Sequence, residues 1–264
     1  MGVGVCKRYA AEREAETMTD YFIKEIKIDW EAIEEDSYLR QIPALRSLEW
    51  LSFTAPVTFF VGENGSGKST LLEGIAVAYG FSPEGGNRNY TFFTYDSHSE
   101  LYQAIQMSKG PRRPKGSYFL RAESFYNVAS KAEDYRDGEL PETYYARYGG
   151  KSLHQRSHGE SFLALVQGDF VPGGLYLLDE PEAALSPQSQ LSLLLKIHQL
   201  AAKGAQFIIA SHSPILLGLP GAGLLAFDDG ELHACTYEET ESYQVTEMFI
   251  NERTYLLERL LREE

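Results

Sequence analysis

The sequence has few cysteines and no long apolar run, and each shortage excludes a class of protein. Its two cysteines, Cys6 and Cys235, stand far apart and form no CxxC or Cys/His cluster, so neither a disulfide framework nor a zinc site is indicated. This usage favours a reducing, cytoplasmic setting. No run reaches the roughly 18 apolar residues that span a bilayer. Residues 1–20 also lack the apolar centre of a signal peptide. We therefore expect a soluble protein with no membrane segment of its own.

Positive charge is also scarce. The chain holds 24 Lys and Arg against 38 Asp and Glu, which gives a formal net charge of −14. Such a field repels the phosphate backbone of nucleic acids. A local basic patch on an acidic protein is still able to bind them, so nucleic acid is not excluded, but the composition does not point to it.

The length of 264 residues suits one α/β core with a smaller insertion. Residues 1–20 are polar and patternless, and a clear strand pattern begins only at Tyr21. We expect either a disordered tail or a true start at Met18. Residues 21–264 then form a single domain.

Short apolar segments predict a parallel sheet. Alternation over 21–29 and a second run at 48–53 indicate strands with one face on a core. Wholly apolar runs at 57–61, 117–122, 175–179 and 205–211 are typical of strands buried on both faces, and helical periodicity follows at 68–79. Strands that alternate with helices indicate a parallel sheet with crossover helices.

Capping and turn residues place the later elements. Ser186 and Pro187 open a helix that stops at Gly204. Asp229-Gly230 forms the turn of a hairpin over 224–235. An amphipathic helix over about 245–261 closes the chain.

Two stretches depart from this alternation. Residues 81–116 are rich in Pro, Gly, Ser and basic residues, which predicts a partly mobile surface insertion around one short helix at 100–109. A helical segment follows over about 124–170. Neither stretch contains the heptads of a coiled coil.

The segment GENGSGKST matches GxxxxGK[ST] completely and lies between a predicted strand and a predicted helix. Glycines let the backbone N–H groups point inward at a phosphate, and the helix adds its positive end. Lys68 would bridge the β- and γ-phosphates, and the Ser69 hydroxyl would bind Mg²⁺. The predicted ATP-binding residues are Gly62, Glu63, Asn64, Gly65, Ser66, Gly67, Lys68, Ser69 and Thr70.

Four apolar strand residues lead into Asp179 and Glu180. Two carboxylates at a strand end are often only a solvated cap. Beside a phosphate loop they have a chemical use, because one is able to hold a metal-bound water and the other to polarise an attacking water. We assign the metal to Asp179 and the role of general base to Glu180.

Taken together, GENGSGKST, LYLLDEPEAALSP and IIASHSP resemble the P-loop, the Walker B segment with its D-loop, and the switch histidine of ABC ATPases. The resemblance covers most of residues 21–227 and is strongest to short stand-alone ATPases of the Rad50, RecF and bacterial-defence branch. It implies a P-loop NTPase fold with an ABC-ATPase-like core, an N-terminal antiparallel β segment and a helical insertion.

The resemblance also assigns further residues. The segment SHGES stands where the family has its signature loop, so Ser157, Gly159 and Glu160 would bind the nucleotide of a partner subunit, with the first two on its γ-phosphate. His212 would contact the γ-phosphate of its own site, although a lone histidine after a strand is often an ordinary one. Glu123 stands where the family has its Q-loop glutamine and would position the metal-bound water.

Several positions differ from the family or stay open. The D-loop ends in Ser186 where the family commonly has Asp, which puts communication between the sites in doubt. Tyr38 and Pro43 are the candidates for stacking on adenine. His154 and His158 stand four residues apart, as zinc ligands on a helix do, but no third ligand is evident.

The leading functional hypothesis is an ATPase that works as an ATP-driven switch. Two chains sandwich two ATP molecules with Mg²⁺, hydrolyse them through Lys68, Glu180 and His212, and separate to act on an unknown effector protein. One alternative is the nucleotide-binding subunit of a membrane transporter, which the unusual signature and D-loop disfavour. The other is a DNA-repair or chromosome-type ATPase, which the missing coiled coil disfavours.

Overall fold

The computed structural model describes residues 21–88, 99–121, 145–146, 148–150 and 152–262. Its strands are β1 (Ile23–Ile28), β2 (Trp50–Ser52), β3 (Val57–Val61), β4 (Gly86–Asn87), β5 (Ile105–Lys109), β6 (Ser117–Arg121), β7 (Leu175–Asp179), β8 (Gln206–Ala210), β9 (Gly223–Asp228) and β10 (Glu231–Cys235). Its helices are α2 (Pro43–Arg46), α3 (Lys68–Tyr79), α4 (Leu101–Ala104), α7 (His158–Asp169), α8 (Pro187–Ala201), α9 (Pro214–Leu217) and α10 (Glu241–Leu260).

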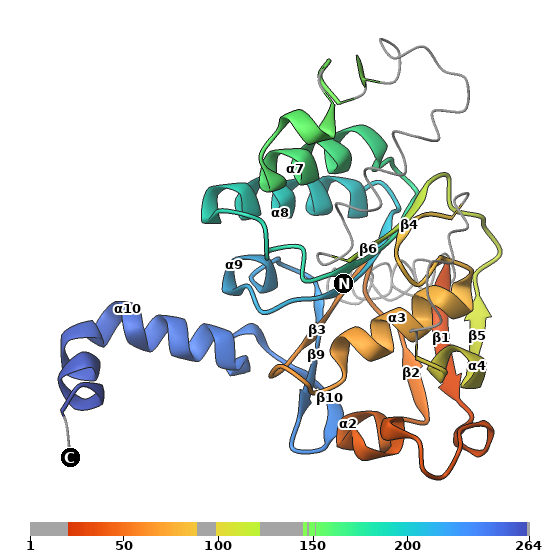
Figure 1. Ribbon diagram of the computed structural model, residues 1–264, viewed down its shortest axis with the longest axis horizontal. Coiled ribbons are helices and arrows are strands. Elements are labelled where there is room, and N and C mark those ends of the chain that lie inside the picture. Colours follow the sequence, from red (N-terminus) through yellow and green to blue (C-terminus); the bar gives the residue numbers. More distant parts are fainter. Residues whose placement is uncertain (1–20, 89–98, 122–144, 147, 151, 263–264) are drawn as a thin grey trace, which may run out of the picture.

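Two sheets form the body of the molecule (Figure 1). The larger has the strand order β10-β9-β3-β8-β7-β6-β4, and its strands are parallel except for β10 and β4 at the two edges. The smaller is antiparallel, with the order β2-β1-β5. This architecture confirms the predicted α/β fold with its antiparallel segment.

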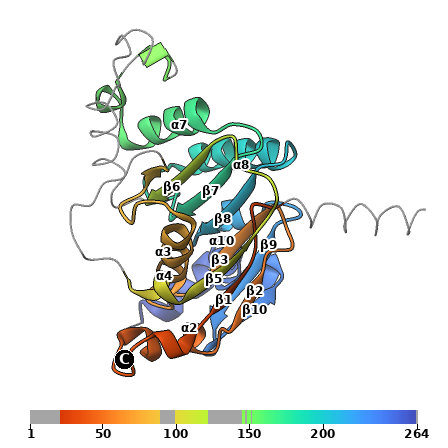
Figure 2. The same cartoon turned by 90° about the vertical axis from the view of Figure 1, so that its right-hand side faces the viewer.

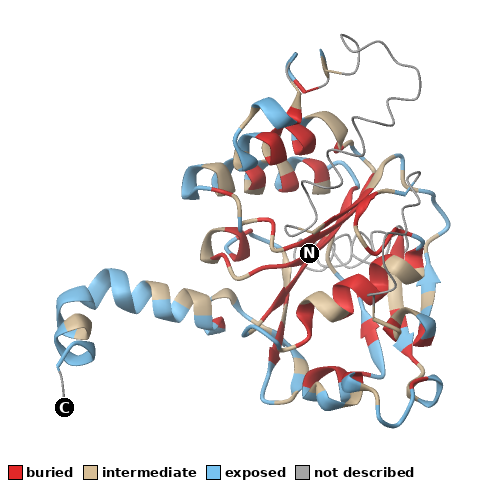
Figure 3. Ribbon diagram, in the orientation of Figure 1, coloured by how far each residue is buried: buried red, intermediate tan, exposed pale blue. Residues whose placement is uncertain are grey.

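Each face of the larger sheet carries its own hydrophobic core. Helix α3 and the smaller sheet cover one face, while α7, α8 and α9 cover the other (Figures 1 and 2). Every residue of β3, β7 and β8 is buried, as Figure 3 shows. Because both faces are covered, these strands read as unbroken apolar runs rather than as alternating ones.

Several predicted boundaries agree with the structure. Helix α3 covers 68–79, and the Ser186 hydroxyl caps α8 by accepting a hydrogen bond from the Ser189 amide. Asp229 and Gly230 turn the β9–β10 hairpin with positive φ angles of 46° and 80°. Helix α10 extends away from the body, and none of its residues is buried (Figure 3).

The helix predicted at 100–109 is wrong. Only Leu101–Ala104 is helical, and Ile105–Lys109 forms β5, which pairs antiparallel with β1. The stretch is also not purely a surface insertion, because Leu101 and Ile105 are buried in the core beneath α3. The free edge of β1 provides hydrogen-bond partners that the local sequence pattern does not reveal. The predicted tail at 1–20 lies outside the described residues.

No helix among the described residues is long and apolar enough to cross a membrane.

Candidate functional site

The glycine-rich loop lies between β3 and α3 at the carboxyl edge of the parallel strands. Gly62 adopts φ 137°, and a Cβ there would stand 2.7 Å from the Phe227 carbonyl oxygen, so only glycine fits. Gly67 precedes α3 in a left-handed conformation and provides no side-chain cap. The first amides of α3 are therefore left to a ligand, which is the arrangement of an anion site at a helix N-terminus.

Lys68 holds this loop in shape. Its side chain is buried, and its Nζ donates hydrogen bonds to the carbonyl oxygens of Gly62 at 2.8 Å and Glu63 at 2.6 Å. Burial lowers the pKa of Lys68, while the nearby carboxylates of Glu180 and Asp179 act in the opposite direction. The structure thus places a cation beneath the loop, where it is able to meet a bound anion.

A second group of side chains meets at the ends of β6 and β7. The Ser69 hydroxyl donates a hydrogen bond of 2.8 Å to Asp179 Oδ1. Arg121 forms an ion pair with Glu73 of α3, and its Nε lies 3.9 Å from Asp179 Oδ2. The structure therefore brings together the two predicted metal residues that it describes, and it adds Arg121, which no sequence motif indicated. The third predicted metal residue, Glu123, lies outside the described residues.

Glu180, which follows β7, and His212, which follows β8, lie close together. Glu180 has a positive φ of 48°, and its Oε1 lies 3.9 Å from His212 Nε2, beyond the length of a hydrogen bond. His212 Nε2 is buried and has no hydrogen-bond partner in the described part of the chain. Burial lowers the pKa of His212, with a further lowering by Lys68, while Glu180, Glu182 and Glu241 raise it. A neutral imidazole with an open nitrogen suits contact with a ligand.

The predicted signature residues lie on a different element. Ser157 caps α7 in a capping box with Glu160, in which the Glu160 carboxylate accepts hydrogen bonds from the Ser157 amide at 2.9 Å and hydroxyl at 2.8 Å. Gly159 packs so tightly on the D-loop that a Cβ would stand 2.6 Å from the Ala184 carbonyl oxygen. These three residues line neither of the hollows beside the phosphate loop that are described next.

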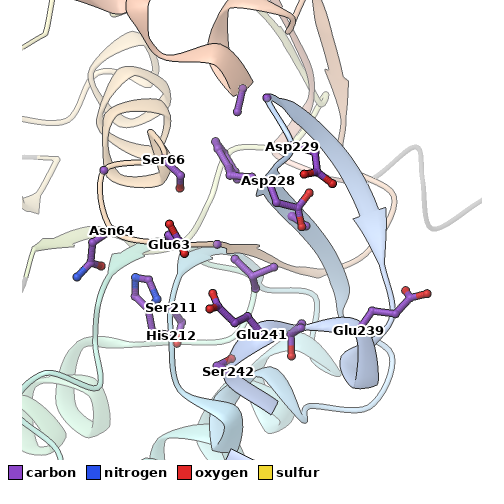
Figure 4. Close-up of a pocket in the computed structure, with 18 of the residues that line it drawn as sticks. Glu63, Asn64, Ser66, Ser211, His212, Asp228, Asp229, Glu239, Glu241 and Ser242 are labelled. Atoms are coloured by element: carbon purple, nitrogen blue, oxygen red, sulfur yellow. The ribbon is translucent and has the colours of Figure 1, made fainter. Parts of the chain in front are cut away.

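A pocket of about 910 Å³ opens beside the loop (Figure 4). Its walls come from the loop itself, the start of α2, the β9–β10 hairpin and the first turn of α10. Pro43 lines it, whereas Tyr38 does not and is exposed. Of the two candidates for stacking on a base, only Pro43 is therefore at a pocket beside the loop.

The first turn of α10 brings the Glu241 carboxylate to this pocket. Glu241 lies among the side chains labelled in Figure 4, together with Glu63 and Asp228. A smaller hollow also borders the loop and is lined by Glu63, Asn64, Glu180, Glu182, Ala183 and His212. Glu182 and Glu241 were not predicted as site residues. Glu241 is far from every motif in the sequence, and Glu182, although it is close to Glu180, gave no sign of its contact with the His212 turn.

Two family models match parts of the chain, and curated relatives cover most of it. A family model described as "AAA domain" matches residues 37–137, and one described as "AAA domain, putative AbiEii toxin, Type IV TA system" matches residues 161–218. The cobalt import ATP-binding protein CbiO of Salmonella typhi is 27% identical over 220 residues, which cover 74% of this chain and 79% of that protein. The ABC transporter G family member STR2 of Medicago truncatula is 25% identical over 223 residues, which cover 76% of this chain but only 29% of the plant protein.

Solved structures with a similar arrangement include cbiO1 of Clostridium perfringens, part of the ABC transporter complex cbiONQ. Its TM-score is 0.48 at 19% identity, and the match covers 90% of this chain and 99% of that one. The SMC head domain of Thermotoga maritima has a TM-score of 0.42 at 14% identity, and the match covers 81% of this chain and 98% of that chain.

A complete GxxxxGK[ST] loop between a buried strand and a helix, with Asp179 hydrogen-bonded to Ser69, defines a P-loop nucleotide-binding protein. The two AAA-domain matches and the ABC ATP-binding relatives show that the chain is an ATP-binding P-loop ATPase similar to the ABC type.

Proposed function

We propose that this ATPase works as an ATP-driven dimerisation switch. The proposal rests on one observation: within one chain, the signature residues lie apart from the other predicted nucleotide-binding residues. The phosphate loop, Asp179, Glu180 and His212 share one edge of the sheet, whereas Ser157 and Gly159 open α7 and line neither hollow beside the loop. A second copy would supply these two residues to the nucleotide, and each chain would complete the site of the other.

The residues present fit a magnesium ion. Mg²⁺ prefers hard oxygen ligands and is commonly held by one or two protein oxygens together with substrate phosphates. The Ser69 hydroxyl and the Asp179 carboxylate provide two oxygens in direct contact, next to the loop. A bound ion would neutralise charge that develops on the phosphate oxygens.

In the proposed reaction Glu180 accepts a proton from the attacking water as that water bonds to the γ-phosphorus, and the bond to the leaving oxygen of ADP breaks. Lys68 holds the β- and γ-phosphates, and His212 contacts the γ-phosphate. The products are ADP and inorganic phosphate. With the γ-phosphate gone, the contact across the dimer is lost and the chains separate.

Glu180→Gln tests this proposal, because glutamine forms hydrogen bonds but does not accept the proton. We expect ATP binding to persist and hydrolysis to slow by orders of magnitude, so that ATP remains in the site and holds two chains together. Light scattering with ATP and Mg²⁺ should then report a dimer, with ADP as the control. Adding Ser157→Arg should return the monomer. A Glu180→Gln protein that stays monomeric at saturating ATP, or dimerises equally with ADP, would contradict the switch.

The curated relatives favour a second candidate. CbiO is named as a cobalt import ATP-binding protein, and its match spans 79% of its own length. A role as the ATP-binding subunit of a transporter would predict stable co-purification with a membrane protein. Pull-down with the Glu180→Gln variant and its trapped ATP would distinguish this candidate from a soluble effector.

A further inference from the structure

Glu182, which directly precedes the D-loop, forms two hydrogen bonds with the turn that carries His212. Its Oε1 accepts a hydrogen bond of 2.9 Å from the Ser211 hydroxyl and one of 2.6 Å from the His212 amide. Hydrogen bonds to a carboxylate are stronger than those between neutral groups. One oxygen atom thus binds two consecutive residues of the turn, Ser211 through its side chain and His212 through its backbone.

Glu182 lines the small hollow beside Glu180 and His212. Its second oxygen, Oε2, is buried without a hydrogen-bond partner among the described residues. A buried carboxylate oxygen without a partner is costly, so local folding stability alone does not account for a glutamate here. This cost is typical of a position held for function.

The D-loop also receives a contact from the start of α7. The Ala184 carbonyl oxygen stands against Gly159, where a Cβ would approach to 2.6 Å. Ala184 is two residues from Glu182, whose carboxylate accepts hydrogen bonds from Ser211 and His212. These contacts place the signature residues and the switch histidine on the two sides of one short segment, residues 182–184.

We propose that Glu182 is a positioning residue for ATP hydrolysis, which fixes the Ser211–His212 turn and so sets where His212 stands against Glu180 and the γ-phosphate. This inference rests on the roles proposed above for His212 and Glu180. Glu182 acts through His212 and does not itself touch the reacting atoms.

A double-mutant cycle tests the proposal, with kcat and KM for ATP measured on Glu182→Ala, His212→Ala and the double variant. We expect Glu182→Ala to lower kcat by about 100-fold, the effect of misplacing a catalytic group by about 1 Å, with KM nearly unchanged. The double variant should be no slower than His212→Ala, because both changes remove the same positioned group. Losses in kcat that multiply would overturn the proposal, as would a His212→Ala protein with full activity.

Two further variants separate positioning from general loosening. Glu182→Gln keeps an oxygen that is able to accept both hydrogen bonds, so it should restore kcat to within about threefold of the parent protein. Gln190→Ala is the matched control, because Gln190 also joins these two segments. It accepts a hydrogen bond of 2.6 Å from the Ser213 hydroxyl and donates one of 3.1 Å to the Leu185 carbonyl oxygen, and within the described residues it forms no hydrogen bond with His212. It should lower the melting temperature but not kcat. A slow Glu182→Gln, or a Gln190→Ala as slow as Glu182→Ala, would overturn the proposal.

These measurements do not depend on dimerisation of the Glu180→Gln protein. If that protein stays monomeric, the proposed dimerisation switch is contradicted, while the double-mutant cycle still tests the role of Glu182. If the losses multiply while Glu180→Gln dimerises with ATP, only the role of Glu182 fails.

Discussion

Lys68 shows how one residue serves both the loop and its ligand. The sequence motif assigned it to the β- and γ-phosphates. In the structure its side chain is also buried, and its Nζ donates hydrogen bonds to two loop carbonyl oxygens. In the proposed complex these hydrogen bonds must give way, at least in part, to bonds with phosphate oxygens. The same cation therefore stabilises the loop before ATP arrives and the phosphates afterwards.

Lys68→Ala should abolish ATP binding and also lower the melting temperature by a few degrees, because two carbonyl oxygens lose their partner. Calorimetric titration with ATP and a thermal melt measure the two effects. Lys203→Ala, at an exposed position after α8, is the control and should change neither. Unchanged ATP affinity in a folded Lys68→Ala protein would remove Lys68 from the site.

Among the elements, α7 has a start that is set by one local contact and one tertiary contact. The capping box of Ser157 and Glu160 begins the helix from local sequence alone. Gly159 then sets how closely the helix approaches the D-loop, and that distance is a tertiary property. The start of α7 is thus fixed twice, once by its own cap and once by the Ala184 backbone.

Gly159→Ala should destabilise the fold by about 1–3 kcal/mol, the usual cost of forcing an extra methyl group into a packed site. Denaturant unfolding measures the loss. Gly223→Ala is the matched control, since a Cβ there would meet Ala55 Cβ at an ordinary 3.6 Å. Equal stability of the two variants would show that α7 and the D-loop are able to move apart without a loss in the free energy of unfolding.

At the scale of the molecule, one side chain joins the two sheets. Gln206, at the start of β8, is buried, and its amide accepts from the Ile23 N–H at 3.0 Å and donates to the Ile23 carbonyl oxygen at 2.8 Å. It thereby satisfies both backbone groups of a β1 residue that its own sheet leaves to this partner. The smaller sheet and the ATPase core are therefore expected to unfold together.

Gln206→Ala should lower the free energy of unfolding by about 2–4 kcal/mol, because two buried backbone groups lose their partners. Chemical denaturation measures this loss, and Gln188→Ala, at an exposed position of α8, should have little effect. A second, separate transition in Gln206→Ala would show that Gln206 makes the two sheets cooperative. A variant as stable as the parent protein would contradict a joining role.

The sequence by itself determined the parallel core and the phosphate loop. Strands β3, β7 and β8 are buried on both faces, so apolar residues fill every position, and a glycine pattern between a strand and a helix is local. The Ser186 cap was likewise readable, because its partner is three residues away.

Only the tertiary structure decided the features whose partners lie far along the chain. Residues 105–109 became β5 because the edge of β1 was open, against a local pattern that indicated a helix. Arg121 meets Glu73, and Glu182 meets Ser211, through contacts between separate elements. Hydrogen bonds and packing between distant segments leave no periodic trace in the sequence, so the residues that surround and position the catalytic groups were visible only once the chain was folded.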